Sequence, residues 1–171
     1  MIIKAIGMIT IVLSSALLGF GFAECMAARE RELENLASAV DRMIGELSYT
    51  HLAMKEIIFR VCPFVMGEAR EMFEDMCTCI QKGDSVAFAW CNALDATAQM
   101  MSLKKEDADA LKKCSYLLEA YELEEQKSCL EALRDKLQSL CADATKVKSK
   151  NSRIVKMLGI YGGVLICIIV F

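Results

Sequence analysis

The chain has 171 residues, 55% of them hydrophobic, and a formal net charge of −3. The charge is uneven, because residues 29–145 contain fourteen Lys and Arg against twenty-two Asp and Glu, a net charge of −8. Binding to nucleic acid requires basic side chains that neutralise phosphates, so this acidic segment argues against nucleic acid as a partner.

The N-terminal segment is long and apolar enough to cross a membrane. No charge interrupts the nineteen residues from Ala5 to Ala23, and as a helix they cover about 28 Å of the roughly 30 Å hydrocarbon core. A cleaved signal peptide is the competing interpretation, because Lys4 precedes the run and Gly21-Phe22-Ala23 offers small residues. The run exceeds the usual apolar region of about 7–15 residues, which favours a retained transmembrane helix within residues 1–28.

Residues 29–150 predict an antiparallel bundle of about six helices. Apolar residues recur at three- and four-residue spacing, and Pro63 is the only proline. The first helix continues from the membrane span with an apolar stripe of Leu33, Leu36, Val40, Met43, Ile44 and Leu47. Its polar side is expected to face water and comprises Arg29, Glu30, Glu32 and Glu34.

The next three helices are short. One begins near Leu52 and ends before Pro63, and the following one spans Phe64 to Gln81. Lys82-Gly83 closes that helix, with the glycine in the left-handed conformation. Asp84 is the predicted N-cap of the fourth helix, which carries Val86, Phe88, Ala89, Trp90 and Leu94.

The fifth helix is expected to begin at the N-cap Ser102 and to run to Leu118. The last helix follows an acidic stretch and carries a seven-residue apolar pattern: Leu123, Gln126, Leu130, Leu133, Leu137, Leu140, Ala144 and Val147. Because no breaker separates this pattern from the C-terminal apolar segment, one long helix is predicted. The pattern favours one side of a bundle over a free-standing coiled coil, since the short helices need a surface to cover.

A second membrane helix is expected at residues 151–171. Met157 to Phe171 are uncharged, and Lys156 can extend to the interface so that two more apolar residues join the buried length. Five cations precede this span: Lys146, Lys148, Lys150, Arg153 and Lys156. Cationic flanks stay in the cytoplasm, so residues 29–150 are predicted to be cytoplasmic and both termini outside. The alternative is an extracytoplasmic domain with one C-terminal anchor after signal cleavage.

The sequence carries no recognisable catalytic set, metal site or cofactor site. Its nine cysteines have no CxxC pair, His51 is the only histidine, and the C-terminal glycines lie in the apolar segment. Cys77 and Cys79 are the closest thiols, but on a helix they point roughly 200° apart. A non-enzymatic protein is therefore predicted, and the alternative in this class is a thiol or metal protein that uses Cys77 and Cys79.

The candidate docking residues are charged. The densest acidic cluster predicts either a surface for a basic partner or an ordinary solvated turn, and consists of Glu119, Glu122, Glu124 and Glu125. A second candidate surface lies beside the membrane, with Arg29 and Arg31.

The order of several short segments resembles the stage III sporulation protein AB family. They are Arg29-Glu30-Arg31-Glu32-Leu33 with Leu36, Glu46-Leu47-Ser48-Tyr49, Ala89-Trp90, Asp107 with Leu111, Leu118 with Glu122 and Gln126, Leu158-Gly159, and Gly162-Gly163. The chain departs from the family pattern in one turn, where Glu119, Tyr121 and Glu122 replace a glycine, a serine and an aspartate.

This resemblance implies a helical bundle similar to the F-protein domains of type II secretion and type IV pilus platforms. It also implies a two-span protein of the mother-cell membrane, in the complex that links mother cell and forespore during endospore formation. The implied partners are a cytosolic secretion-type ATPase and other membrane subunits of that complex, and homo-oligomerisation is left open.

Overall fold

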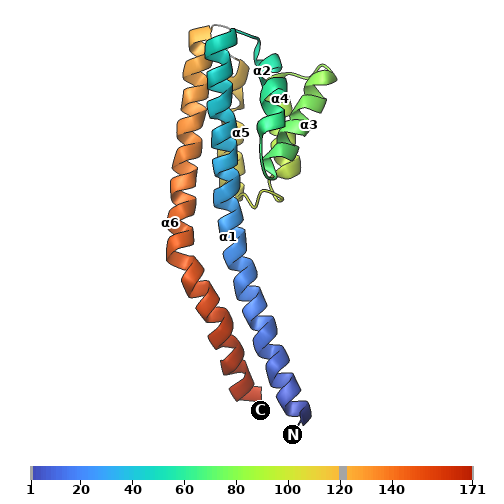
Figure 1. Ribbon diagram of the computed structural model, residues 1–171, viewed down its shortest axis with the longest axis vertical. Helices are drawn as coiled ribbons and strands as arrows, with labels where there is room; N and C mark the ends of the chain where they lie inside the picture. Colours follow the sequence, from blue (N-terminus) through green and yellow to red (C-terminus); the bar gives the residue numbers. More distant parts are fainter. Residues whose placement is uncertain (1, 120–122, 171) are drawn as a thin grey trace. The chain divides into compact units, whose positions relative to one another are not determined.

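The structure is a computed structural model that describes the backbone of residues 2–119 and 123–170 (Figure 1). Within this part, the side chains of residues 2–6, 8, 9, 117, 152, 153, 156, 159, 160 and 163–170 are not described. The described chain has no strand, which confirms the predicted all-α class. Its elements are α1 (Ile2–Thr50), α2 (Met54–Val61), the 3-10 helix η1 (Cys62–Phe64), α3 (Ala69–Gln81), α4 (Val86–Thr97), α5 (Lys105–Lys113), the 3-10 helix η2 (Ser115–Glu119) and α6 (Leu123–Val170).

The chain divides into two compact units. Residues 29–142 form one unit, here called the helical domain, and residues 1–28 with 143–171 form the other, here called the terminal helix pair. The backbone of α1 is one helix of 49 residues and that of α6 one helix of 48 residues, so each belongs to both units. The prediction that each long helix continues without a break is confirmed.

Small residues occur where the two helices of the terminal helix pair approach each other at Gly162 and Ser15. A Cβ added to Gly162 on α6 would lie 3.9 Å from the Oγ of Ser15 on α1. Gly19 and Ala23, four and eight residues after Ser15, are buried on the same helix. Small residues at this spacing let helix backbones approach closely in a membrane.

The outward side of α1 in this pair is apolar, with Leu17, Leu18 and Phe22 exposed. Within the described residues, one helix is long and apolar enough to cross a membrane, and its qualifying segment lies in α1 near the N-terminus. A second span in α6 stays a prediction.

The core of the helical domain lies along the apolar stripes of α1 and α6, which are side by side in this unit (Figure 1). On α1 the stripe is buried as predicted, apart from the half-buried Ile44. On α6 the buried leucines of this unit are Leu130, Leu133, Leu137 and Leu140. Arg134 on α6 approaches Asp41 on α1, with 3.9 Å between Nη1 and Oδ1. The short helices complete the core, and their largest fully buried side chains include Trp90, Phe73, Ile57 and Met76.

The turn between α3 and α4 differs from its prediction by one residue. Gly83 has the expected left-handed conformation, with φ of +101°. The N–H of Asp84 donates to Cys79 O at 3.2 Å and so belongs to the closing turn of α3. Ser85 is therefore the N-cap of α4, and its Oγ accepts from Phe88 N at 3.3 Å. The prediction of Asp84 as the cap was wrong.

Two other predicted helix starts were also wrong. α3 begins at Ala69 and not at Phe64, because η1 and a turn at Gly67, with φ of +67°, come between. α5 begins after the N-cap Lys104, whereas Ser102 has a left-handed φ of +53°. α5 also ends earlier than expected, since it stops at Lys113 and Leu118 belongs to η2.

Candidate functional site

The polar side of α1 at residues 29–34 is largely covered by other helices. Arg29, Glu30 and Glu32 are only 7%, 9% and 8% exposed, so the prediction that they face water was wrong, whereas Glu34 is exposed. The short helices α3 and α5 supply the partners of two of these side chains from distant parts of the chain. Arg29 precedes Leu33 by four residues, and Glu32 precedes Leu36 by four, so helical spacing already places both beside the apolar stripe.

Arg29 forms a buried two-point ion pair with Asp107 on α5. Its Nε lies 2.6 Å from Oδ2 and its Nη2 lies 2.8 Å from Oδ1. The Oδ2 atom also accepts from the Lys104 N–H at 3.1 Å, at the start of α5. Burial alone would raise the pKa of Asp107, but the bonds from Arg29 and from the Lys104 backbone outweigh it, so the pKa is lowered. Arg29 thus joins α1 to α5, and this placement removes it from the exposed docking candidates.

Glu32 caps the N-terminus of α3 from α1. Its Oε2 accepts from the Ala69 N–H at 2.9 Å and from Asn35 Nδ2 at 3.3 Å. A carboxylate at this place satisfies a helix N–H group that has no partner within the helix and favours the positive end of the helix dipole. Gly67 leaves room for the arrangement, because a Cβ there would overlap the Glu32 carboxylate and the Asn35 amide.

Arg31 is exposed on α1 and remains a docking candidate from this segment. Of the acidic cluster, Glu119, Glu124 and Glu125 are exposed, and Glu122 lies outside the described residues. Glu119 makes a contact within the helical domain, because its Oε1 accepts a hydrogen bond from Ala87 N, in the first turn of α4, at 3.3 Å. Glu124 and Glu125 stand in the first turn of α6, where acidic side chains favour the helix dipole.

The cations ahead of the C-terminal segment lie along α6 in the terminal helix pair. Lys146 and Lys150 are exposed, and Lys148 is half-buried. Lys146 Nζ lies 3.6 Å from Asp143 Oδ1, one turn earlier on the same helix. Arg153 and Lys156 have a described helical backbone, and their side chains lie outside the described part. Their role in membrane topology stays a prediction.

The structure does not bring the Cys77 and Cys79 thiols together. Cys79 is buried, and its Sγ lies 3.5 Å from the Nδ2 of Asn92 on α4. Burial raises the pKa of the Cys77 thiol to about 12, and Cys62, at the start of η1, adds to this increase. Sequence reasoning missed this influence of Cys62 on Cys77, because no spacing rule links a residue of η1 to one on α3. In the described part of the chain, no group of three or more His, Cys, Asp or Glu could hold a metal ion.

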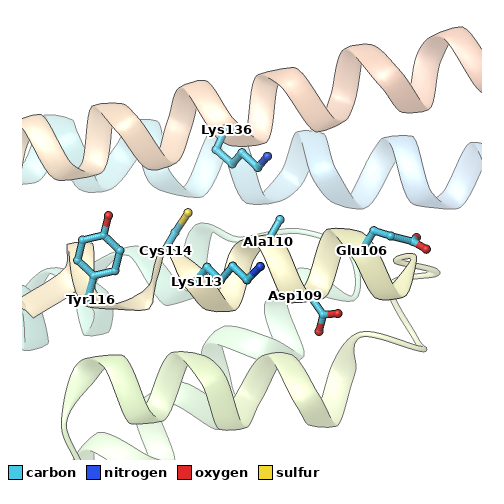
Figure 2. A pocket seen from close by; sticks show the side chains of 7 residues that line it. All are labelled: Glu106, Asp109, Ala110, Lys113, Cys114, Tyr116 and Lys136. Carbon is cyan, nitrogen blue, oxygen red and sulfur yellow. The ribbon is translucent and has the colours of Figure 1, made fainter.

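An open groove of about 550 Å³ lies between α5, η2 and α6 (Figure 2). Lys136 extends from α6 over it. Ala110 on α5 and Cys114, the C-cap of α5, face that lysine. Burial raises the pKa of the Cys114 thiol, and the charge of Lys136 partly offsets this. Acidic and basic side chains share the lining, so the groove has no single electrostatic preference.

Three comparisons identify relatives of this chain. The family model described as Stage III sporulation protein AB (spore_III_AB) matches residues 4–171. Stage III sporulation protein AB of Bacillus subtilis (strain 168) is 24% identical over 168 residues, which cover 98% of each chain. A solved structure of Stage III sporulation protein AB (SpoIIIAB) has a TM-score of 0.64 and 22% identity, covers 72% of this chain and 98% of the solved chain, and shows the shared fold. From this match over nearly its whole length, the chain belongs to the stage III sporulation protein AB family.

Proposed function

We propose that this sporulation protein is a non-enzymatic membrane platform subunit of the complex that links mother cell and forespore during endospore formation. The observation that carries the proposal is the continuity of α1 and α6. Each helix contributes a core stripe to the helical domain and then continues, without a backbone break, into the terminal helix pair. A subunit built in this way holds a protein-binding domain at a fixed point of the membrane.

The buried polar contacts support a stiff connection inside the helical domain. Arg29, the first residue of that unit, is bonded to α5, and Glu32 is bonded to the start of α3. A paired buried charge that loses its partner is costly, so these bonds resist separation of the short helices from α1. The short helices therefore present a fixed surface to partners, which suits assembly.

The membrane arrangement in this proposal has two spans in the mother-cell membrane and a cytoplasmic helical domain. The apolar segment of α1 supports the first span. Lys and Arg that flank a membrane span are retained on the cytoplasmic side. The cations of α6 therefore support a cytoplasmic location for the chain just before the second span. Cleavage of the N-terminal segment as a signal peptide would contradict this arrangement, and N-terminal sequencing of the mature protein detects it.

The docking partner in this proposal is a cytosolic secretion-type ATPase. Glu124 and Glu125 are exposed at the start of α6 and offer negative charge to a basic surface. They differ from Glu119, which is also exposed but accepts a hydrogen bond from Ala87 N in α4. Arg31 on α1 is the alternative contact.

The proposal is tested by site-specific photocrosslinking in sporulating cells. A photoreactive amino acid replaces Glu124, and the control protein carries it at Glu71, which is exposed on α3. The proposal predicts that mass spectrometry finds the ATPase in the adduct from position 124 and not in that from position 71. Adducts at both positions that contain only unrelated cytosolic proteins would contradict the docking assignment.

A further inference from the structure

The connection between α4 and α5, residues 98–104, is here called the α4–α5 loop and holds one methionine at the surface. Backbone hydrogen bonds fix its turn, in which the Leu103 N–H donates to the Ala98 carbonyl oxygen at 3.0 Å. Met101 is fully buried and anchors the loop in the helical domain, whereas Met100 is 49% exposed. The loop therefore presents an apolar side chain to its surroundings from a fixed backbone.

Two lysines follow Met100 at the start of α5. Lys104 is the N-cap and Lys105 is the first residue of the helix, and both are exposed. The next residue, Glu106, lines the groove between α5 and α6 (Figure 2). An exposed apolar side chain with lysines beside it is typical of protein surfaces that lie in a membrane interface.

The Arg29–Asp107 pair ties this loop to the part of α1 that follows the apolar run. The Lys104 N–H donates to Asp107 Oδ2 at 3.1 Å, and the same Oδ2 lies 2.6 Å from Arg29 Nε. On α1, Arg29 follows Ala23 by six residues, which is about 9 Å of helix rise. The headgroup layer on each side of a bilayer is roughly 5–8 Å thick. When the run that ends at Ala23 spans the membrane, Arg29 is therefore at the outer edge of the headgroups.

We propose that the α4–α5 loop and Lys105 form a lipid-contact surface, which binds the anionic phospholipid headgroups around the first span. Met100 enters the interface, and the ammonium groups of Lys104 and Lys105 contact phosphate groups. The inference rests on the cytoplasmic placement in the proposed function, because the cytoplasmic leaflet carries the negative surface potential. Each lysine near such a surface strengthens binding about five-fold. The contact adds a point of attachment to the membrane besides α1 and α6.

The opposite end of the helical domain offers matched lysines for a control. The start of α2 and the end of α3 lie at that end, away from the α4–α5 loop (Figure 1). Lys55, near the start of α2, and Lys82, the C-cap of α3, are both exposed. Reversal of these two charges changes the net charge as much as reversal of Lys104 and Lys105.

The test measures lipid contact of the full-length protein in nanodiscs whose lipids carry bromine on the acyl chains, because bromine quenches tryptophan fluorescence at short range. The nanodiscs contain phosphatidylcholine alone or phosphatidylcholine with phosphatidylglycerol. Trp90 is the only tryptophan and is fully buried, so wild type gives the background. Met100→Trp adds a reporter in the loop. Phe88→Trp adds one in the first turn of α4, where Phe88 is 56% exposed.

The expected result is a loss of emission from the tryptophan at position 100 in the phosphatidylglycerol nanodiscs, with a much smaller loss in phosphatidylcholine alone. The tryptophan at position 88 should keep its emission in both. Lys104→Glu with Lys105→Glu, added to Met100→Trp, should lower the ratio of lipid-bound to free loop by at least about 25-fold. Lys55→Glu with Lys82→Glu should leave the quenching unchanged.

Hydrogen exchange of the wild-type protein gives a readout that needs no substitution, so a variant that fails to fold does not decide the result. Amides of residues 98–105 should exchange more slowly with phosphatidylglycerol present than with phosphatidylcholine alone. Amides of residues 82–85 should exchange equally in the two kinds of nanodisc. Unchanged exchange of residues 98–105 in the wild-type protein would overturn the proposal.

The fluorescence experiment has its own contrary outcomes. Quenching at position 100 no stronger than at position 88 would overturn the proposal and leave the loop to a protein partner. Equal quenching in the two lipid compositions would also overturn it, because the lysines would then have no part in the contact. Nanodiscs expose both membrane faces and contain no ATPase. Absence of lipid contact together with an intact ATPase crosslink at position 124 would therefore count against this inference and not against the platform function.

Discussion

At the residue scale, the Trp90 side chain links two of the short helices, α4 and α5. Its side chain is fully buried, and its indole N–H donates to the Leu111 carbonyl oxygen at 3.0 Å, so α4 is joined to α5 by both packing and a hydrogen bond. Phe88, two residues earlier on the same helix, is 56% exposed. The two aromatic residues therefore provide a matched comparison on one helix.

Trp90→Ala should lower the free energy of unfolding by about 3–5 kcal/mol, the usual cost of truncating a large buried aromatic side chain. Phe88→Ala should change it by less than about 0.5 kcal/mol, as for most surface substitutions. Urea unfolding of the full-length protein in detergent, followed by circular dichroism, measures both. Equal midpoints for Trp90→Ala and wild type would show that the indole does not stabilise the domain.

The Arg29–Asp107 pair gives a second prediction at this scale. Asp107→Ala leaves the buried guanidinium of Arg29 without its carboxylate, and such a loss costs about 3–5 kcal/mol. Asp109→Ala is the control, because Asp109 is exposed on the same helix. Thermal unfolding should show a large decrease for Asp107→Ala and a small one for Asp109→Ala. Similar melting temperatures for the two variants would contradict a structural role for the pair.

The same pair predicts a pH dependence of stability. The pKa of Asp107 is lower in the folded protein than the ordinary value of about 3.9 for an unfolded aspartate. Its contribution is therefore fully present above about pH 5 and is lost as pH falls through the folded pKa. Wild type should lose more stability than Asp107→Asn between pH 5 and 3. Parallel pH profiles for the two proteins would exclude this linkage.

At the scale of elements, the cap of α4 can be tested by neighbouring substitutions. Ser85→Ala removes the side-chain oxygen that accepts from Phe88 N, and the loss of such a cap costs about 1 kcal/mol. Asp84→Ala should cost less, because the Asp84 backbone, not its side chain, closes α3. Chemical unfolding ranks the two variants, and a larger loss for Asp84→Ala would restore Asp84 as the effective cap.

The elements differ in how far the sequence predicts them. The long helices follow from apolar periodicity, and the end of α2 before Pro63 follows from the backbone restriction imposed by proline. Which residue becomes the N-cap, as Ser85 and Lys104 do, depends on which residues close the preceding turn. Neighbouring polar residues are equally suitable caps by type, so the sequence does not show which one is used. The burial of Arg29 depends on a partner that is 78 residues away. The local sequence pattern does not contain this partner and therefore predicted a solvent-exposed Arg29 side chain.

The acidic start of α6 carries a prediction about docking. Glu124→Lys with Glu125→Lys should weaken association with the ATPase, most strongly at low ionic strength, because exposed charges act mainly through long-range attraction. Glu119 is left unchanged, since it bonds to α4. Binding of purified proteins at two salt concentrations and the yield of spores are the measurements.

The control for this prediction is Glu71→Lys with Asp75→Lys, which reverses two exposed charges on α3. Reversal in the first turn of α6 also costs about 0.3–1 kcal/mol per residue through the helix dipole, so the melting temperature of both variants is compared. ATPase affinity at low salt equal to that of wild type would exclude Glu124 and Glu125 as the docking surface and direct attention to Arg31.

At the scale of the whole molecule, the proposed function depends on which side of the membrane holds the helical domain. The continuity of α1 and α6 ties that domain to both apolar ends of the chain. The family assignment and the helical fold follow from the comparisons, whereas the sidedness rests on the cations before the C-terminal segment.

The most direct measurement places a specific protease site at Lys82, an exposed residue between α3 and α4 where folding does not prevent cleavage. Added protease should leave the protein intact in protoplasts of sporulating cells and should cut it after the membranes are opened with detergent. Cleavage at this site in intact protoplasts, with a cytosolic control protein uncut, would place the domain outside the cytoplasm and contradict docking to a cytosolic ATPase.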